Sequence, residues 1–361
     1  MISSEIKKLI ETSKLVIKDC ALENGAIVAA NTDHLYYPRE AGNYRWVWPR
    51  DAAFICLAAK ILSFKKIPEK YFSWLLERPQ DFKRNSLLYA NYATNGRFGS
   101  MGKIFQPDQM GATLLAIHFF YQDNLKKALK FKELIERLAN GICNVWDKTH
   151  FSLHSIDIWE EVIRKTTTTM ENNFTYSLAS CAKGLFLADK IISNPIWRET
   201  ASQMLKEIEE AYDKKRGYFL RSVGKVLDLN IDASNLGLVW PFEIFSPDDK
   251  RIVKTVRKIE ENLVEKGGVH RFQFDYFDSE GSAWEGGGAW PILNFWLAIY
   301  WVLRKNKKKA LKYYYWVIKR VKKFNYFIPE QIFEDFRVGI YPLAWSHAMF
   351  VIASKYLGFI K

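Results

Sequence analysis

The strongest constraint on the fold is a helical repeat of apolar residues that continues through most of the chain. Apolar positions recur every three or four residues in separate segments, as expected for helices that bury one face. Twelve segments are expected to be helical: 5–19, 50–63, 68–76, 107–122, 124–146, 172–191, 195–213, 233–243, 247–265, 289–304, 306–323 and 342–358. Only short strand-like stretches such as 217–220 interrupt the pattern. The sequence therefore predicts an all-α protein.

The connections between these helices alternate in length. Short links follow the even-numbered helices, and long links precede them. The long links are residues 20–49, 77–106, 147–171, 214–232, 266–288 and 324–341. Short connections favour antiparallel neighbours, so this alternation predicts six hairpins closed into an (α/α)6 barrel, with all the long loops on one rim. No linker rich in Pro, Gly or Ser divides the chain, and residues 1–361 are expected to form a single domain.

Composition excludes several classes of protein. The net charge is +13, but basic residues are interleaved with acidic ones and no nucleic-acid motif is present, so no nucleic-acid partner is predicted. The longest apolar stretch, 289–303, is too short to span a bilayer. The four cysteines lack metal-ligand spacing, and the amphipathic first helix is unlike a signal peptide. These features predict a cytoplasmic protein without a metal or other cofactor; oligomeric state leaves no signal.

Two glutamates in aromatic-rich long loops are the candidates for chemistry. Glu160 lies in the motif Asp-Ile-Trp-Glu-Glu at 157–161, and Glu330 lies in Pro-Glu-Gln at 329–331. A carboxylic acid facing a carboxylate across a sugar-sized gap is the minimum needed to cleave a glycosidic bond. Like charge and partial burial should raise one pKa in the pair Glu160 and Glu161, so that a protonated general acid is available. Glu330 could be the general base.

The other long loops offer groups suited to sugar hydroxyls. Arg50 and Asp51 place a fork of donors beside an acceptor at a helix start flanked by tryptophans. Arg271 suits bidentate hydrogen bonding. Asp108 is near a helix N-terminus, where the helix dipole favours a carboxylate. Taken alone, each could instead cap a helix or form an ordinary ion pair. His347 lies within a helix and is expected to be structural.

Taken in order, these motifs resemble the catalytic domain of glycoside hydrolase family fifteen, the glucoamylase family. The resemblance covers almost the whole chain and rests on WPRDA at 48–52, QPDQMG at 106–111, DIWEE at 157–161, DAS at 232–234, GGVHRF at 267–272, W-E-GGG-AW at 284–290, PEQ at 329–331 and PLAWSHA at 342–348. It implies an (α/α)6 barrel that hydrolyses α-glucosidic bonds at non-reducing ends with inversion.

The resemblance also implies roles for individual residues. Glu160 would be the general acid and Glu330 the general base, while Glu161 would contact the substrate and keep Glu160 protonated. Arg50 and Asp51 would hold the outer hydroxyls of the terminal glucose, and Arg271 would bind near the cleaved bond. Further substrate-binding candidates are Asp108 and the aromatic residues Tyr44, Trp48, Trp159, Trp290 and Trp345.

Two departures from the family pattern bear on the substrate. Prokaryotic members usually carry an N-terminal β-sandwich, and here the barrel begins near residue 1, without a starch-binding module. This favours short soluble α-glucoside oligosaccharides over polymers. The stretch 162–173 differs from the usual pattern beside the acid, so the aglycone preference stays open.

We predict an exo-acting α-glucosidase that releases β-D-glucose from the α-1,4 bonds of malto-oligosaccharides. A trehalase or an α-1,6-glucosidase are the alternatives within the family, because loop geometry beyond the first sugar sets the linkage. A non-catalytic glycan-binding or regulatory barrel would need neither Glu160 nor Glu330. A polysaccharide lyase would need a cationic cleft with a Tyr or His base, which the motifs do not favour.

Overall fold

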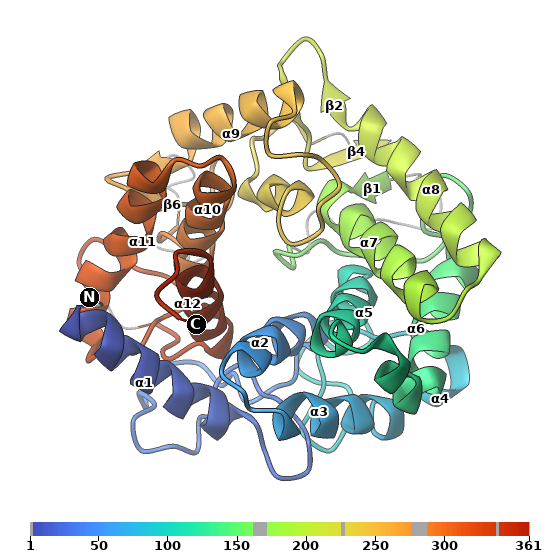
Figure 1. Ribbon diagram of the computed structural model, residues 1–361, viewed down its shortest axis with the longest axis horizontal. Helices are drawn as coiled ribbons and strands as arrows, with labels where there is room; N and C mark the ends of the chain where they lie inside the picture. Colours follow the sequence, from blue (N-terminus) through green and yellow to red (C-terminus); the bar gives the residue numbers. More distant parts are fainter. Residues whose placement is uncertain (1–2, 162–171, 225–227, 276–286, 337–338, 361) are drawn as a thin grey trace.

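The computed structural model describes residues 3–161, 172–224, 228–275, 287–336 and 339–360. Its helices form two concentric rings (Figure 1). The inner ring consists of α2 (Pro49–Ile61), α5 (Asp108–Tyr121), α7 (Thr175–Ile191), the 3-10 helix η3 (Ala233–Leu238), α10 (Pro291–Leu303) and α12 (Ala344–Tyr356). Each packs against the next, and α12 closes the ring against α2. The outer ring consists of α1 (Ser4–Cys20), α3 (Lys66–Glu77), α6 (Lys132–Asn144), α8 (Pro195–Glu210), α9 (Lys250–Asn262) and α11 (Lys307–Val321). The predicted (α/α)6 barrel is confirmed.

Burial explains which helices lie inside. The inner helix α10 is buried at every position from Pro291 to Tyr300, so it is covered on all sides. The outer helix α6 buries one stripe, including Leu134, Leu138 and Ile142, and leaves its other face to solvent. A helix with apolar residues on all sides belongs between neighbours, whereas an amphipathic helix covers a core.

The inner helices α5 and α7 approach each other closely at two glycines. A Cβ atom on Gly111 would lie 2.3 Å from the backbone carbon of Ser180, and one on Gly184 would lie 2.8 Å from the Cα atom of Gly111. Any side chain at either position would force the two helices apart. The glycine of the Gln-Pro-Asp-Gln-Met-Gly motif therefore serves the packing of the barrel.

Several helix boundaries differ from the predicted ones. The predicted helix 233–243 is present only as η3, which ends at Leu238, and Pro241 lacks the N–H group that would be needed to continue a helix beyond it. The predicted helix 124–146 starts with the 3-10 helix η1 (Leu125–Phe131) before α6. Helix α9 begins at Lys250, where Asp249 accepts a cap hydrogen bond from the N–H of Arg251. Two short helices, α4 (Phe82–Asn85) and η4 (Lys322–Phe324), were not predicted as separate elements.

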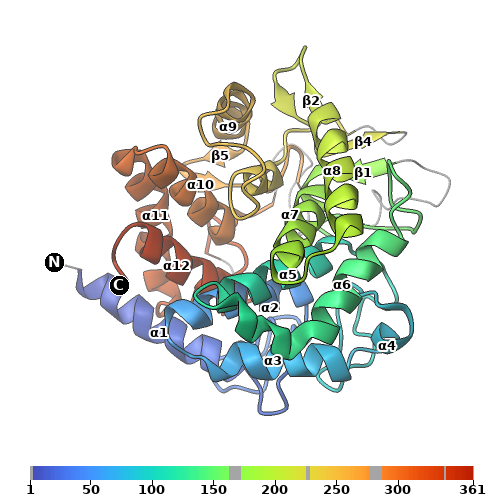
Figure 2. The same ribbon diagram turned by 45° about the vertical axis from the view of Figure 1, so that its right-hand side comes forward.

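Within the described residues, the strands are short and pair as three antiparallel hairpins or ribbons. The pairs are β1 (Asn172–Phe174) with β4 (Ser222–Gly224), β2 (Tyr212–Asp213) with β3 (Tyr218–Phe219), and β5 (Val264–Glu265) with β6 (Gly268–Val269). β1 and β4 lie beside α7 and α8 (Figure 2), and they join the third long loop to the fourth. None of the described helices has the length and apolar content required to cross a membrane.

Candidate active site

The first turns of three inner helices meet around Arg50. Arg50 and Asp51 lie in the first turn of α2, and Asp108 is the first residue of α5. The Arg50 guanidinium lies 3.2 Å from the Asp51 carboxylate and 3.4 Å from that of Asp108. Its plane lies 5.1 Å from the ring centroid of Trp345, in the first turn of α12. The barrel therefore brings together Arg50 and Trp345, which are 295 positions apart in the sequence.

Glu160 reaches the same arginine from the third long loop. Its Oε1 atom accepts a hydrogen bond of 2.8 Å from the indole N–H of Trp48 and lies 3.6 Å from Arg50. Its backbone φ is +62°, in the left-handed region that glutamate rarely adopts. The loop thus holds Glu160 in an unusual conformation that turns its side chain toward the first turn of α2.

Burial raises the pKa of Glu160 to about 7. Arg50 and the hydrogen bond from Trp48 lower this pKa, whereas the charges of Asp51 and Asp108 raise it. Such a carboxyl group keeps its proton in a large fraction of molecules at neutral pH, as a general acid must. The carboxylates that raise the Glu160 pKa here belong to α2 and α5, and not to Glu161 as the sequence suggested.

The loop that carries Glu330 is tied to α12. The N–H of Ile328 donates to Nε2 of His347 at 2.8 Å, and the hydroxyl of Ser346 donates to the carbonyl of Pro329 at 2.8 Å. Burial lowers the pKa of His347 to about 3, so the imidazole stays neutral and accepts this hydrogen bond. The structural role predicted for His347 agrees with these contacts, which fix the backbone just before Glu330.

Burial also raises the pKa of Glu330 to about 7. Arg271 and a hydrogen bond with Tyr44 lower this pKa, while the charges of Asp51 and Glu160 raise it. The charge of Glu160 thus reaches Glu330, so the two carboxyl groups lie within electrostatic reach of each other. Near neutral pH a large share of the molecules carries one proton on this pair.

Arg271 lies between aromatic rings on the same rim. Asp275 accepts two hydrogen bonds from its guanidinium, at 2.8 and 2.7 Å. The guanidinium lies 5.6 Å from the ring centroid of Trp159 and 4.9 Å from that of Trp290. The two indoles meet edge to face at 5.6 Å. The structure thus brings the predicted residues Arg271, Trp159 and Trp290 into one cluster.

The remaining aromatic candidates lie near Glu160 or Arg50. The rings of Tyr44 and Trp48 are 5.4 Å apart, and Trp48 is almost buried. Trp345 is 3% exposed, and its ring packs against the Arg50 guanidinium. Asp108 is likewise fully buried behind Arg50.

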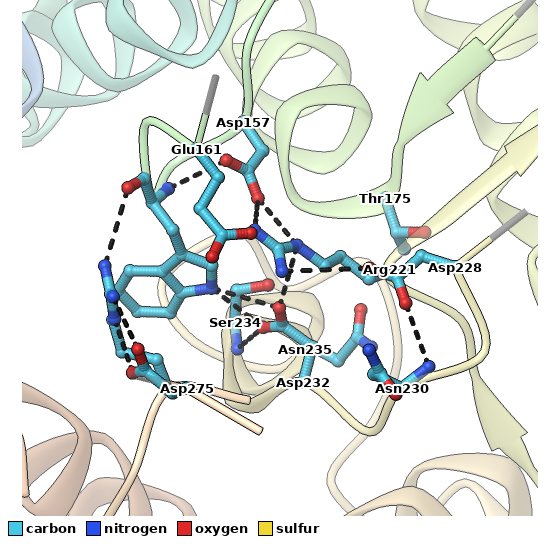
Figure 3. Close-up of polar contacts among 12 residues, drawn as sticks. Asp157, Glu161, Thr175, Arg221, Asp228, Asn230, Asp232, Ser234, Asn235 and Asp275 are labelled. Carbon is cyan, nitrogen blue, oxygen red and sulfur yellow. Dashed lines mark hydrogen bonds and ion pairs between the residues drawn. The ribbon is translucent and has the colours of Figure 1, made fainter. Parts of the chain in front are cut away.

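Glu161 points away from Glu160, toward an arginine of another loop. Its carboxylate lies 3.2 Å from the guanidinium of Arg221, which also pairs with Asp157 and Asp232 (Figure 3). The two acidic side chains of the Trp-Glu-Glu motif therefore contact different arginines.

Two predicted features, the stretch beside the acid and the start of the W-E-GGG-AW motif, cannot be placed, because residues 162–171 and 284–286 lie outside the described part of the chain. Within that part, no three His, Cys, Asp or Glu side chains are grouped so as to hold a metal ion.

The sequence model described as "Glycosyl hydrolases family 15" matches residues 5–330. The chain belongs to this family. An uncharacterized glycosyl hydrolase of Methanocaldococcus jannaschii is 30% identical over 356 residues, covering 91% of this chain and 52% of the relative. A trehalase of Thermoplasma volcanium is 24% identical, covering 94% of this chain and 56% of the relative. The chain thus spans about half the length of the curated relatives it matches.

Solved structures share the fold. A glycosidase matches with a TM-score of 0.81 and 20% identity, and each chain is covered completely. A bacterial glucoamylase complexed with acarbose matches with a TM-score of 0.73 and 19% identity, covering 96% of this chain and 55% of the other. These likenesses establish the barrel fold that the helix and loop pattern predicted.

In this member of glycosyl hydrolase family 15, no sequence motif points to Arg221. It follows β3 as a lone arginine between Leu220 and Ser222, with no motif around it. Asp232, in the DAS motif, caps η3, where its carboxylate accepts a hydrogen bond of 2.7 Å from the N–H of Ser234. Its second partner, the indole of Trp159, could not be inferred from a position 73 residues away.

Proposed function

We propose that this chain is an inverting, exo-acting α-glucosidase in which Glu160 is the general acid and Glu330 the general base. The observation that carries the proposal is the pair itself: two glutamates from different loops, Glu330 buried and Glu160 largely so, each with a pKa raised to about 7 and within electrostatic reach of each other. A single proton on this pair provides one acid and one base at the same pH.

In this mechanism Glu160 protonates the oxygen of the leaving sugar while Glu330 takes a proton from the attacking water. Water adds to the anomeric carbon from the face opposite the leaving group, so an α-glucoside gives β-D-glucose. Inversion requires the two carboxyl groups to be about 6.5–9.5 Å apart, which leaves room for that water. After turnover Glu160 has lost a proton and Glu330 has gained one, and exchange with solvent resets the pair.

The neighbouring groups would hold the terminal glucose. Arg50 and Asp51 present donors and an acceptor to its hydroxyls, and Tyr44 and Trp48 supply a ring surface beside Glu160. We assign Asp108 an indirect part, because it is buried and contacts Arg50.

Glu161 and the tryptophans complete the assignment. The indole N–H groups of Trp290 and Trp345 are buried and have no acceptor among the described residues, and a sugar hydroxyl could accept from either. Arg271, beside Trp159 and Trp290, would bind near the cleaved bond. Glu161 would act at the edge of the site through its ion pair with Arg221.

We propose α-1,4-linked malto-oligosaccharides as the substrate class, cleaved from the non-reducing end. A trehalase is the second candidate, because a curated relative covering 94% of this chain is named a trehalase. An α-1,6-glucosidase is the third. We further propose that residues 1–361 form one catalytic domain, since α1 packs against α12 and ties the N-terminal helix to the barrel. The four cysteines are unpaired, which supports a reducing cytoplasmic location.

The test is a proton NMR time course of the purified protein with maltotriose, isomaltose and trehalose. β-Glucose appearing first from maltotriose would support an inverting α-1,4-glucosidase. Consumption of trehalose or isomaltose alone would reassign the linkage and keep the mechanism. α-Glucose appearing first would refute the acid and base assignment, as would substantial activity in Glu160→Gln or Glu330→Gln. No reaction with any sugar would favour a binding role.

A further inference from the structure

A second buried arginine organises the loop that carries Glu160. The side chain of Arg221 is 2% exposed. Its guanidinium lies 2.7 Å from Asp157, 3.1 Å from Asp232, 3.2 Å from Glu161 and 3.7 Å from Asp228 (Figure 3). Four carboxylates from two long loops thus converge on one cation. A buried charge is tolerated when partners and hydrogen bonds compensate its desolvation, and here they do so from several directions.

Arg221 is itself fixed to the barrel. The N–H of Thr175, the first residue of α7, donates to the carbonyl of Arg221 at 3.0 Å. The hydroxyl of Thr175 donates to the carbonyl of Leu220 at 2.6 Å. The guanidinium also lies over the ring of Phe272, 4.4 Å from its centroid. The cation is therefore anchored to an inner helix and cannot follow the loop that it binds.

Two of the carboxylates on Arg221 hold Trp159, the residue before Glu160. Oδ1 of Asp157 accepts a hydrogen bond of 3.1 Å from the backbone N–H of Trp159. The two carboxylate oxygens of Asp232 accept from its indole N–H at 3.1 and 3.0 Å. Trp159 is consequently fixed at its backbone and at the far end of its side chain, and both attachments lead to Arg221.

The residue on the other side of Glu160 is held by the same cation. Glu161 pairs with Arg221 at 3.2 Å, so both neighbours of Glu160 are attached to one anchored group. Glu160 has φ of +62°, a conformation that costs on the order of 1–3 kcal/mol and persists only where surrounding contacts enforce it. With Trp159 and Glu161 fixed, the left-handed turn at Glu160 directs its carboxyl to the opposite side, toward Trp48 and Arg50.

We propose that Arg221 is a positioning residue for Glu160: through Asp157, Asp232 and Glu161 it enforces the left-handed turn that aims the Glu160 carboxyl at the leaving group. Its side chain is 2% exposed, so it would act on the reaction only through the residues that it holds. The inference rests on the proposed role of Glu160 as general acid. It predicts that loss of the Arg221 contacts impairs proton donation to the leaving group, while sugar binding at Arg50 and water activation at Glu330 continue.

The experiment compares Arg221→Lys with Asp228→Asn. Lysine keeps the charge but loses the planar fork that contacts several carboxylates at once. Asp228→Asn is the matched control, because Asp228 also contacts Arg221 while its other carboxylate oxygen accepts from the backbone N–H of Asn230, within its own loop. Each variant is assayed on the α-glucoside that the wild type cleaves and on α-D-glucosyl fluoride, whose fluoride leaves with little need for a proton.

For Arg221→Lys we expect kcat on the natural glycoside to fall about 100-fold, as for other small misplacements of a reacting group, with KM nearly unchanged. The rate on α-D-glucosyl fluoride should stay close to that of the wild type. Asp228→Asn should resemble the wild type on both substrates. Equal losses on both substrates, a change in KM alone, or the same effect in Asp228→Asn would overturn the proposal.

Two further measurements keep the test decisive. If Arg221→Lys does not fold, Asp232→Asn tests the same link, because Asn keeps an oxygen for the Trp159 indole but loses the charge paired with Arg221. Crystal structures of the variant used and of Asp228→Asn then report the contact between Glu160 and Trp48, which is 2.8 Å in the intact protein. An unchanged contact would refute the positioning role. If the wild type cleaved no glycoside, the proposed function would fail, and these structures would still decide the positioning role.

Discussion

Replacing Glu160 by glutamine should stabilise the protein at alkaline pH while abolishing turnover. Glutamine has the shape of a protonated glutamate and retains the Oε1 atom that accepts from Trp48. It cannot donate a proton to a leaving group, and it cannot become charged. The variant therefore mimics the neutral, protonated state of Glu160 at every pH.

The magnitude follows from the pKa of the folded protein. Burial raises the Glu160 pKa from 4.5 to about 7, so the folded state holds this proton more tightly than the unfolded chain does. The wild type has the full stability of the neutral carboxyl below pH 4.5, and loses it as the pH rises toward 7 and above. At about pH 8 the loss amounts to about 3 kcal/mol. Glutamine avoids this loss.

The assay is calorimetry of Glu160→Gln and wild type at about pH 4 and about pH 8. The difference in stability between the two proteins should grow by about 3 kcal/mol between these conditions, or about 4 °C in Tm for a chain of this length. Glu40→Gln, at an exposed position, controls for the loss of one negative charge. The reasoning would be refuted if the variant were no more stable than the wild type at the higher pH. It would also be refuted if the stability difference between the two proteins were the same at both pH values.

Three further outcomes are expected. Glu330→Gln should lower kcat by roughly 10²–10⁴-fold with little change in KM, measured by steady-state kinetics; a retained kcat would exclude Glu330 as the base. Tyr44→Phe removes a hydrogen bond that lowers the Glu330 pKa, so the acidic limb of the pH profile of kcat/KM should move to higher pH, and an unmoved limb would contradict the contact. Gly111→Ala places a Cβ atom 2.3 Å from the backbone of Ser180 and should destabilise the protein by about 1–3 kcal/mol in urea unfolding, whereas Gly42→Ala, 3.5 Å from its nearest neighbour, should not.

The barrel could be predicted because two independent patterns agree. Apolar periodicity locates helices, and the alternation of short and long links arranges them in hairpins. The boundaries were less predictable where two signals compete within one turn. The predicted helix 247–265 starts at Pro247, but α9 begins at Lys250 and is capped by Asp249. The segment before Pro241 is apolar enough for an α-helix, yet it forms only η3. This outcome was not predictable, because apolar periodicity does not separate an α-helix from a 3-10 helix of a few residues.

The members of the candidate site were predictable, but their partners were not. Arg50, Asp51, Asp108 and Glu160 each stand in a recognisable motif at a loop end, and the structure brings these four into contact. Which carboxylate acts on which pKa depends on distances between loops, and a sequence contains none of these distances. Arg221 was missed for the same reason, because its importance lies entirely in contacts with residues of other segments.

The adjacent pair Glu160 and Glu161 shows why local reasoning reaches this limit. Two neighbouring carboxylates in a sequence are expected to repel each other and to raise one pKa. In the structure a left-handed backbone at Glu160 separates them, so that Glu160 faces Arg50 and Glu161 faces Arg221. Arg50 also contacts Asp51 and Asp108, whose charges add to the effect of burial in raising the pKa of Glu160. The conformation of one residue thus decides which charges act on it, and that conformation is enforced by contacts on both sides of it that only the folded chain provides.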